Sequence, residues 1–308
     1  MKKFIGSVLA TTLILGGCST MENESKKDTK TETKSVPEEM EASKYVGQGF
    51  QPLAEKDAIE FAKKHKDKIA KRGEQFFMDN FGLKVKATNV VGSGDGVEVF
   101  VHCDDHDIVF NASIPFDKSI IDSDSSLRSE DKGDDMSMMV GTVLSGFEYR
   151  AQKEKYDNLY KFFKDNEEKY QYTGFTKEAI NKTQNSGCEN EYFYITTIPY
   201  NLTEYRDYFE PLLNKSDSEF SKELSNVKKQ LKDKSKVSVT TTLFSKKKNY
   251  TKKSNSENVI KMAEEIKKEK EIPNGIDLSI KFSDNKINTV KPNYNGKSTS
   301  EYGVFDQE

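Results

Sequence analysis

The chain has 308 residues, of which 34% are hydrophobic and 32% are charged, and its formal net charge is -3. This length suits one or two domains, and the low apolar content predicts small cores in which 19 Phe and 14 Tyr supply much of the buried area. Because lysines and acidic residues are interspersed along the chain, it lacks the basic footprint of a nucleic-acid-binding protein.

The first 18 residues have the pattern of an export signal. Residues 1–3 form a cationic head, residues 4–15 are mostly apolar, and Leu15-Gly16-Gly17-Cys18 follows. The apolar run is too short for a membrane span, which needs about 20 residues. The last four residues resemble the lipobox of bacterial lipoproteins. This resemblance implies a signal peptide over 1–17, cleavage before Cys18, and S-diacylglyceryl and N-acyl groups, such as palmitate, on that cysteine.

Two acyl chains are enough for stable membrane attachment, whereas one chain binds only marginally. The lipobox therefore predicts a protein anchored to the extracytoplasmic face of the cell membrane, with membrane lipid as a partner through Cys18. The alternative is a plain secretory signal with a chance cysteine. Residues 18–44 are almost entirely polar, so we expect this segment to be a disordered tether spanning about 25–30 Å.

Residues 45–116 have the pattern of a first α+β module. Apolar residues recur at helical spacing over 55–80, and Gly82 is a plausible end for that helix. Three strand-like runs follow at 83–91, 97–103 and 108–114, and Pro115 is expected to end the third. The pattern predicts one helix packed on a three-stranded antiparallel meander.

Residues 117–175 read as an acidic loop followed by a long helical connector. The helix is expected over 136–170, either continuous or in two parts joined near 141–146, where two glycines occur. Its apolar and aromatic stripe is typical of packing against a core.

Residues 176–290 are expected to form a second α+β module. A short helix capped by Thr176 precedes a strand over 191–199, and two more helices follow up to residue 232. A strand over 236–244, a helix over 256–270 and a closing hairpin complete the module, and residues 291–308 are a polar tail. The whole pattern predicts an α+β fold with small antiparallel sheets packed by helices, in two modules behind the tether.

The densest group of chemically active residues is the run 102–107, which contains His102, Asp104 and His106. On a strand these three side chains share one face, and imidazole and carboxylate groups are ligands for zinc or manganese. The alternative is a hairpin turn flanked by two surface histidines. The first reading gives a divalent metal bound by His102, Asp104 and His106, and the alternative, which we favour, gives no cofactor.

After Cys18 two thiols remain. Cys103 alternates with valines and is expected to be buried, whereas Cys188 lies in a polar stretch and is expected to be exposed. An exposed and a buried cysteine are poor disulfide partners, so we favour two unpaired thiols over one disulfide.

The lipobox, the Ser/Thr/Lys tether and the segment from Tyr45-Val46-Gly47-Gln48-Gly49-Phe50 to Phe193-Tyr194-Ile195 resemble a family of uncharacterised Gram-positive lipoproteins, known as domain of unknown function 1672. The likeness covers essentially the whole chain. It implies membrane attachment and transfers only Cys18, because the family has no assigned catalytic residues.

Three classes of function remain open. The first, which we favour, is a non-catalytic binding protein for an envelope component or another protein. The second is a solute-binding receptor of a transporter, although the chain lacks the long βαβ series of two doubly wound lobes. The third is a metal-dependent enzyme that uses His102 and His106.

Overall fold

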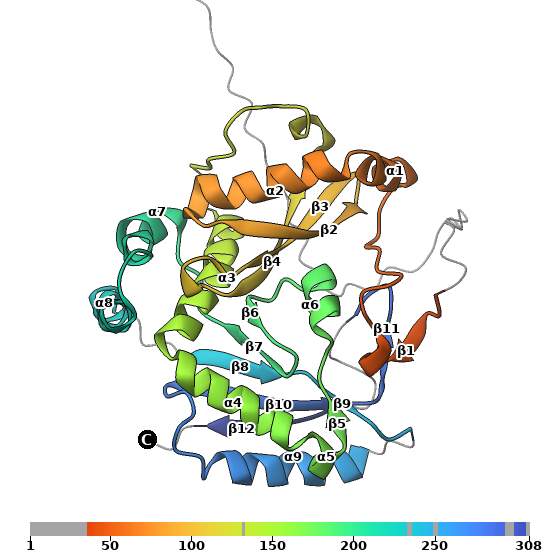
Figure 1. The fold of residues 1–308 in the computed structure, drawn as a ribbon, viewed down its shortest axis with the longest axis vertical. Helices are drawn as coiled ribbons and strands as arrows, with labels where there is room; N and C mark the ends of the chain where they lie inside the picture. Colours follow the sequence, from red (N-terminus) through yellow and green to blue (C-terminus); the bar gives the residue numbers. More distant parts are fainter. Residues whose placement is uncertain (1–35, 131–132, 233–235, 249–251, 293–298, 306–308) are drawn as a thin grey trace, which may run out of the picture.

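The computed structural model describes residues 36–130, 133–232, 236–248, 252–292 and 299–305. The predicted signal peptide, Cys18 and the tether up to residue 35 lie outside these residues. In the described part of the chain, two larger β-sheets packed by helices and one small two-stranded sheet make up the fold, with the three-stranded sheet above the seven-stranded sheet in Figure 1. The α+β class predicted from the sequence is confirmed.

The first sheet is the predicted meander of β2 (Val85–Ser93), β3 (Gly96–Cys103) and β4 (Phe110–Phe116). Helices α1 (Lys56–Lys64) and α2 (Lys66–Phe81) cover one face of it (Figure 1). On that face the alternate β3 side chains are fully buried: Val97, Val99, Val101 and Cys103.

Two details of this module differ from the prediction. The single helix expected over 55–80 is broken at His65, whose φ/ψ of -111°/19° lies outside the helical region. Pro115 lies inside β4 instead of ending the strand before it. The missing N–H of Pro115 costs no hydrogen bond to β3, because β4 is an edge strand and the backbone nitrogen of Pro115 lies on the side away from β3.

The first core also includes helices from later in the chain. They are α3 (Asp134–Ala151), α7 (Leu202–Glu204) and α8 (Asp217–Gln230), with a π-turn over Tyr205–Phe209 and a 3-10 turn over Glu210–Leu212 between the last two. The sequence assigns residues 202–231 to the second module, but Tyr205, Phe209 and Phe220 pack against Phe147 of α3. The predicted module over 176–290 therefore does not pack as one unit, because this helical segment folds back on the first core.

The predicted joint of the long connector lies elsewhere. The helix breaks at Gln152, where φ/ψ is -127°/33°, between α3 and α4 (Lys153–Asp165). Gly141 and Gly146 lie inside α3. A Cβ at Gly146 would come within 2.9 Å of the Val109 carbonyl oxygen, so this glycine lets α3 pack closely against the chain entering β4.

Within the residues that the structure describes, the second sheet has seven strands. They are β5 (Tyr172–Thr173), β6 (Cys188–Glu189), β7 (Phe193–Thr196), β8 (Val237–Thr241), β9 (Leu243–Ser245), β10 (Ile276–Ser283) and β12 (Ser300–Phe305). Both β8 and β9 pair in parallel with β10, because α9 (Lys252–Ile266) carries the chain back across the sheet. The sheet is thus mixed, whereas the sequence predicted antiparallel pairing.

The C-terminal segment also differs from its prediction. The polar tail expected over 291–308 contains β12, which pairs antiparallel with β10 over six residues. In the described residues, the strand after β10 does not form the predicted closing hairpin: β11 (Lys286–Asn288) pairs instead with β1 (Glu39–Glu41) from the other end of the chain.

The two faces of the second sheet differ in character. Helices α4, α9 and α5 (Glu167–Tyr170) pack on one face over a core of aromatic and aliphatic side chains (Figure 1). The alternate residues of β7, β8 and β10 point to the other face and are polar and at least partly exposed: Tyr194, Thr196, Ser238, Thr240, Asp277 and Ser279.

The last residues of the predicted tether are ordered. Residues 39–41 form β1 and residues 42–44 form a 3-10 turn, so disorder up to residue 44 is wrong. A third small core explains the order, since Ala42 and Tyr45 are buried beside α6 (Lys177–Thr183). The Tyr45 hydroxyl also donates a 2.9 Å hydrogen bond to the Thr289 carbonyl oxygen.

Candidate functional site

A cleft of about 410 Å³ lies where the two sheets meet. It is lined by β3 and β4, by the first half of α3, by Asn185 and Ser186, and by β7 with the residues that follow it. Its volume lies in the range of ligand-binding clefts, about 300–1,000 Å³.

The edge of β4 forms one side of the cleft. Asn111 exchanges two backbone hydrogen bonds with Gly187, so its N–H and C=O point away from β3. The direction of the backbone N–H and C=O groups alternates from residue to residue along an antiparallel strand. The backbone groups of Ser113 and Pro115 therefore also point away from β3. In the described part of the chain, no backbone partner pairs with these two residues on that side.

Strand β6, at the edge of the second sheet, lies next to β4 of the first sheet on one side of the cleft. It pairs antiparallel with β7 and is bridged to β4 through Gly187. Gly187 has φ +105°, and a Cβ there would come within 2.6 Å of Ser145 Oγ and 2.9 Å of the Ile195 carbonyl oxygen. Asn185 and Ser186, which precede Gly187 in the chain, are not part of β6 and line the cleft. The cleft therefore begins at the N-terminal end of β6.

Polar groups are arranged along the β4 side. Asn185 Nδ2 donates to Ser113 Oγ at 2.7 Å, and that hydroxyl donates to Glu98 Oε1 at 2.7 Å. Glu98 is the only charged side chain among the described residues that line the cleft. The chain of hydrogen bonds holds the carboxylate at the cleft wall, where it favours a cationic group.

Helix α3 forms the opposite wall. Thr197 Oγ1 donates to the Gly141 carbonyl oxygen at 3.0 Å, which attaches the segment after β7 to this helix. Met138 is 49% exposed and Thr142 is partly exposed, and both line the cleft. Methionine adapts its shape readily, so this wall suits a variable apolar side chain.

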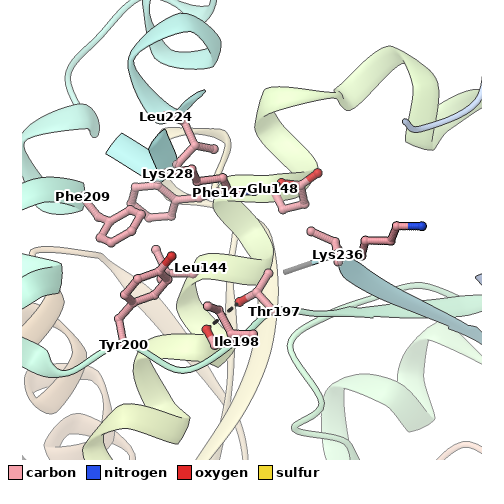
Figure 2. Close-up of a pocket in the computed structure, with 11 residues that line it drawn as sticks. Leu144, Phe147, Glu148, Thr197, Ile198, Tyr200, Phe209, Leu224, Lys228 and Lys236 are labelled. Carbon is pink, nitrogen blue, oxygen red and sulfur yellow. Dashed lines mark hydrogen bonds and ion pairs between the residues drawn. The ribbon is translucent and has the colours of Figure 1, made fainter. Parts of the chain in front are cut away.

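A second, much smaller cavity lies behind α3, with a volume of about 20 Å³ (Figure 2). The rings of Phe147, Phe209 and Tyr200 gather on one side of it, and the Lys236 side chain points away from them (Figure 2). Buried Glu148 accepts from Lys228 Nζ at 2.8 Å. This volume holds about one water molecule, so the cavity is too small for a metabolite.

Comparison with known proteins identifies the family. The family described as "Protein of unknown function (DUF1672)" matches residues 32–308. The chain belongs to the DUF1672 family. A crystal structure of a DUF1672 family protein from Staphylococcus aureus subsp. aureus Mu50 is 69% identical, with a TM-score of 0.87. The match covers 89% of this chain and 100% of that chain. The comparison with curated proteins gave no match.

The predicted metal ligands of this DUF1672 chain are not gathered around one point. His102 lies on β3, half-buried, with Nδ1 3.3 Å from Asn111 Oδ1. Asp104 is exposed, and His106 lies in a 3-10 turn with φ +53°. Among the described residues, no three His, Cys, Asp or Glu side chains are placed to hold a metal ion. The arrangement gives the metal prediction no support.

The two cysteines in the described part of the DUF1672 chain, Cys103 and Cys188, are unpaired, as favoured from the sequence. Cys188, however, is buried and not exposed, because β6 places it in the second core beside Ile195. Burial raises the pKa of Cys103 to about 12 and also raises the pKa of Cys188. Neither thiol is an activated nucleophile.

The predicted anchor, Cys18, lies outside the described residues. Within the described ranges, no helix has both the length and the hydropathy that crossing a bilayer requires.

The sequence did not reveal the cleft residues. Asn185 and Ser186 belong to a polar stretch with no motif, and Ser113 belongs to a predicted strand; they meet only because β6, at the edge of the second sheet, is bridged to β4. Gly141 in an otherwise helical pattern was the one usable signal, since such a glycine often marks a close contact.

Proposed function

We propose that this DUF1672 chain is a lipid-anchored protein of the extracytoplasmic face of the cell membrane that binds a partner in the cleft without transforming it. The lipobox at residues 15–18 supports the anchor. The cleft carries the binding role, because its lining offers hydrogen-bonding, methionine and backbone groups. Ser113 donates to a carboxylate there, and no histidine or lysine is among the described lining residues.

The anchor is tested by replacing the acylated sulfur. In a bacterium that processes lipoproteins, Cys18→Ser should move the full chain from the detergent phase of an envelope extract to the aqueous phase, because the two acyl chains are lost. Ser19→Ala, which leaves the sulfur in place, should partition as the wild-type chain does. Equal partitioning of Cys18→Ser and wild type would contradict the anchor.

The binding role is tested by photo-crosslinking in intact cells. Benzoylphenylalanine in place of Met138 puts the reactive group at the cleft wall, and in place of Met78 it puts the group on α2, away from the cleft. The two methionines are matched controls, since they are 49% and 42% exposed.

An adduct formed from position 138 and not from position 78 is the expected result. Mass spectrometry of the adduct then gives the class of partner, and a small-molecule adduct would favour the solute-receptor alternative. If position 138 yields no more adduct than position 78, the cleft is not a binding site.

A further inference from the structure

The cleft has the features of a vacant strand position, and we infer that its occupant is an extended polypeptide segment of a partner, added as a strand to β4. This inference rests on the binding role proposed above and specifies the partner class. It depends on the backbone groups at the edge of β4, on the width of the gap and on the side chains around it.

The backbone of β4 is directed toward the cleft. Ser113 presents both an N–H and a C=O on the side away from β3, and Pro115 presents a C=O there. Ser113 is only 9% exposed and lines the cleft. Unpaired groups on an edge strand are a template for another strand, and peptide recognition by strand addition uses this arrangement.

The width of the gap is set by the protein itself. One strand, β6, already lies between β4 and β7, bridged to the first at Gly187 and paired with the second at Cys188 and Glu189. Strands in one sheet lie about 4.7–4.9 Å apart. Beyond Gly187, β4 continues to Phe116 and the segment after β7 lines the cleft with Thr197 and Pro199, so the space there continues the same row of strands.

The surrounding side chains fit the alternating sides of an extended peptide. On one side Met138 and Thr142 of α3 form an adaptable wall, and on the other side Glu98 is held by Ser113. A peptide with an apolar residue toward Met138 and a Lys or Arg toward Glu98 matches this chemistry.

The test uses the full mature chain carrying Cys18→Ser and a display library of short random peptides. Peptides are selected on this chain and counter-selected on the same chain with Thr142→Trp, which fills the cleft without altering β4. We expect selected peptides that bind Thr142→Trp at least about tenfold more weakly, since a buried contact of about 1.4 kcal/mol is a factor of ten. Ser137→Trp, on the same helix but outside the cleft lining, should bind as the parent chain does.

A second pair of variants tests the backbone of β4. Ser113→Pro removes the N–H that faces the cleft and should weaken binding about tenfold, whereas Ser113→Ala keeps that N–H and should change it much less. The strand already contains Pro115 in the same orientation, so Ser113→Pro retains the ladder to β3. In a selected peptide, methylation of the alternate backbone nitrogens that face β4 should abolish binding. Methylation of the other alternate set should not.

The inference is wrong if no selected peptide distinguishes the open cleft from Thr142→Trp, or if Ser113→Pro binds as tightly as Ser113→Ala with its melting temperature retained. If the melting temperature of Ser113→Pro is lowered, the comparison of peptide binding to the parent chain and to Thr142→Trp decides whether the inference holds. A non-peptide adduct at position 138 in cells would leave the proposed binding role intact and overturn only the strand.

Discussion

Asn111 of β4 and Gly187, the residue before β6, exchange two backbone hydrogen bonds with N···O distances of 2.7 and 3.2 Å. This bridge connects the edge of the first sheet to the second sheet, which lies below it in Figure 1. The cleft opens immediately beside the bridge. The residues that hold Gly187 in place should therefore affect both the stability of the fold and the shape of the cleft.

Gly187→Ala should destabilise the protein strongly. Its φ of +105° is unfavourable for alanine, and the added Cβ would lie 2.6 Å from Ser145 Oγ. Backbone strain and overpacking together predict a loss of about 3 kcal/mol in the free energy of unfolding, measured by urea denaturation. Gly275→Ala is the control: it has φ +68°, but its Cβ meets no described atom within 4 Å, so we expect a loss of about 1 kcal/mol. Equal losses in the two variants would argue against a close contact at Gly187.

Ser145→Ala should destabilise the bridge from the other side. Ser145 is fully buried, and its Oγ accepts from the Cys188 N–H at 2.6 Å and donates to the Thr142 carbonyl oxygen at 2.6 Å. Without the hydroxyl, a buried N–H loses its acceptor, which costs about 2 kcal/mol in urea denaturation. Ser137→Ala, on the exposed first turns of the same helix, should cost less than about 0.5 kcal/mol. A loss at Ser145 no larger than at Ser137 would contradict this role.

His102 should make stability depend on pH. Burial lowers the pKa of His102 from its ordinary value of 6.5, although the contact with Asn111 opposes the shift. Below about pH 6.5 the unfolded chain therefore binds a proton that the folded chain resists, and the free energy of unfolding falls with falling pH. His102→Gln should remove this component, so the difference between the two chains changes between about pH 7.5 and about pH 5.

Urea midpoints of the wild-type and His102→Gln chains across this pH range measure the difference. If His102→Gln instead shows the same profile as the wild type, the imidazole of His102 titrates alike in both states.

The two buried thiols should be unreactive in the folded protein. In the full chain carrying Cys18→Ser, Cys103 and Cys188 are the remaining cysteines. Burial blocks access and raises the pKa of both, to about 12 for Cys103, so little thiolate forms at about pH 8. A chromogenic disulfide reagent should therefore label neither thiol in buffer and both in denaturant without reductant. Failure to label in denaturant would indicate a disulfide.

Elements with a strong local pattern were predicted well. The alternating valines of β3 and the Thr176 cap of α6 appear in the structure as the sequence indicated, because side-chain alternation and capping depend on neighbouring residues. The break at Gln152 was placed wrongly at Gly141–Gly146, since these glycines serve contacts with Thr197 and Val109 rather than a bend. A local pattern does not distinguish the two uses of a helical glycine.

Pairings between distant segments were not predictable. Met40 pairs with Ile287, and Val304 pairs with Leu278. The sequence nevertheless predicts a disordered tether around Met40 and a polar tail around Val304. Short edge strands gain their order mainly from the partner strand and the core beneath it, and neither is visible in six residues of sequence. The burial of Cys188 has the same origin.

The order of residues alone is sufficient to predict the α+β class, the first helix-and-meander module and the membership of the family, because these depend on local periodicity or on likeness of sequence. The cleft, the mixed second sheet and the return of residues 202–231 to the first core arise only in the folded chain. They depend on which sheet edges and helix faces meet. That choice is made by burial of apolar surface and pairing of backbone groups across long stretches of chain.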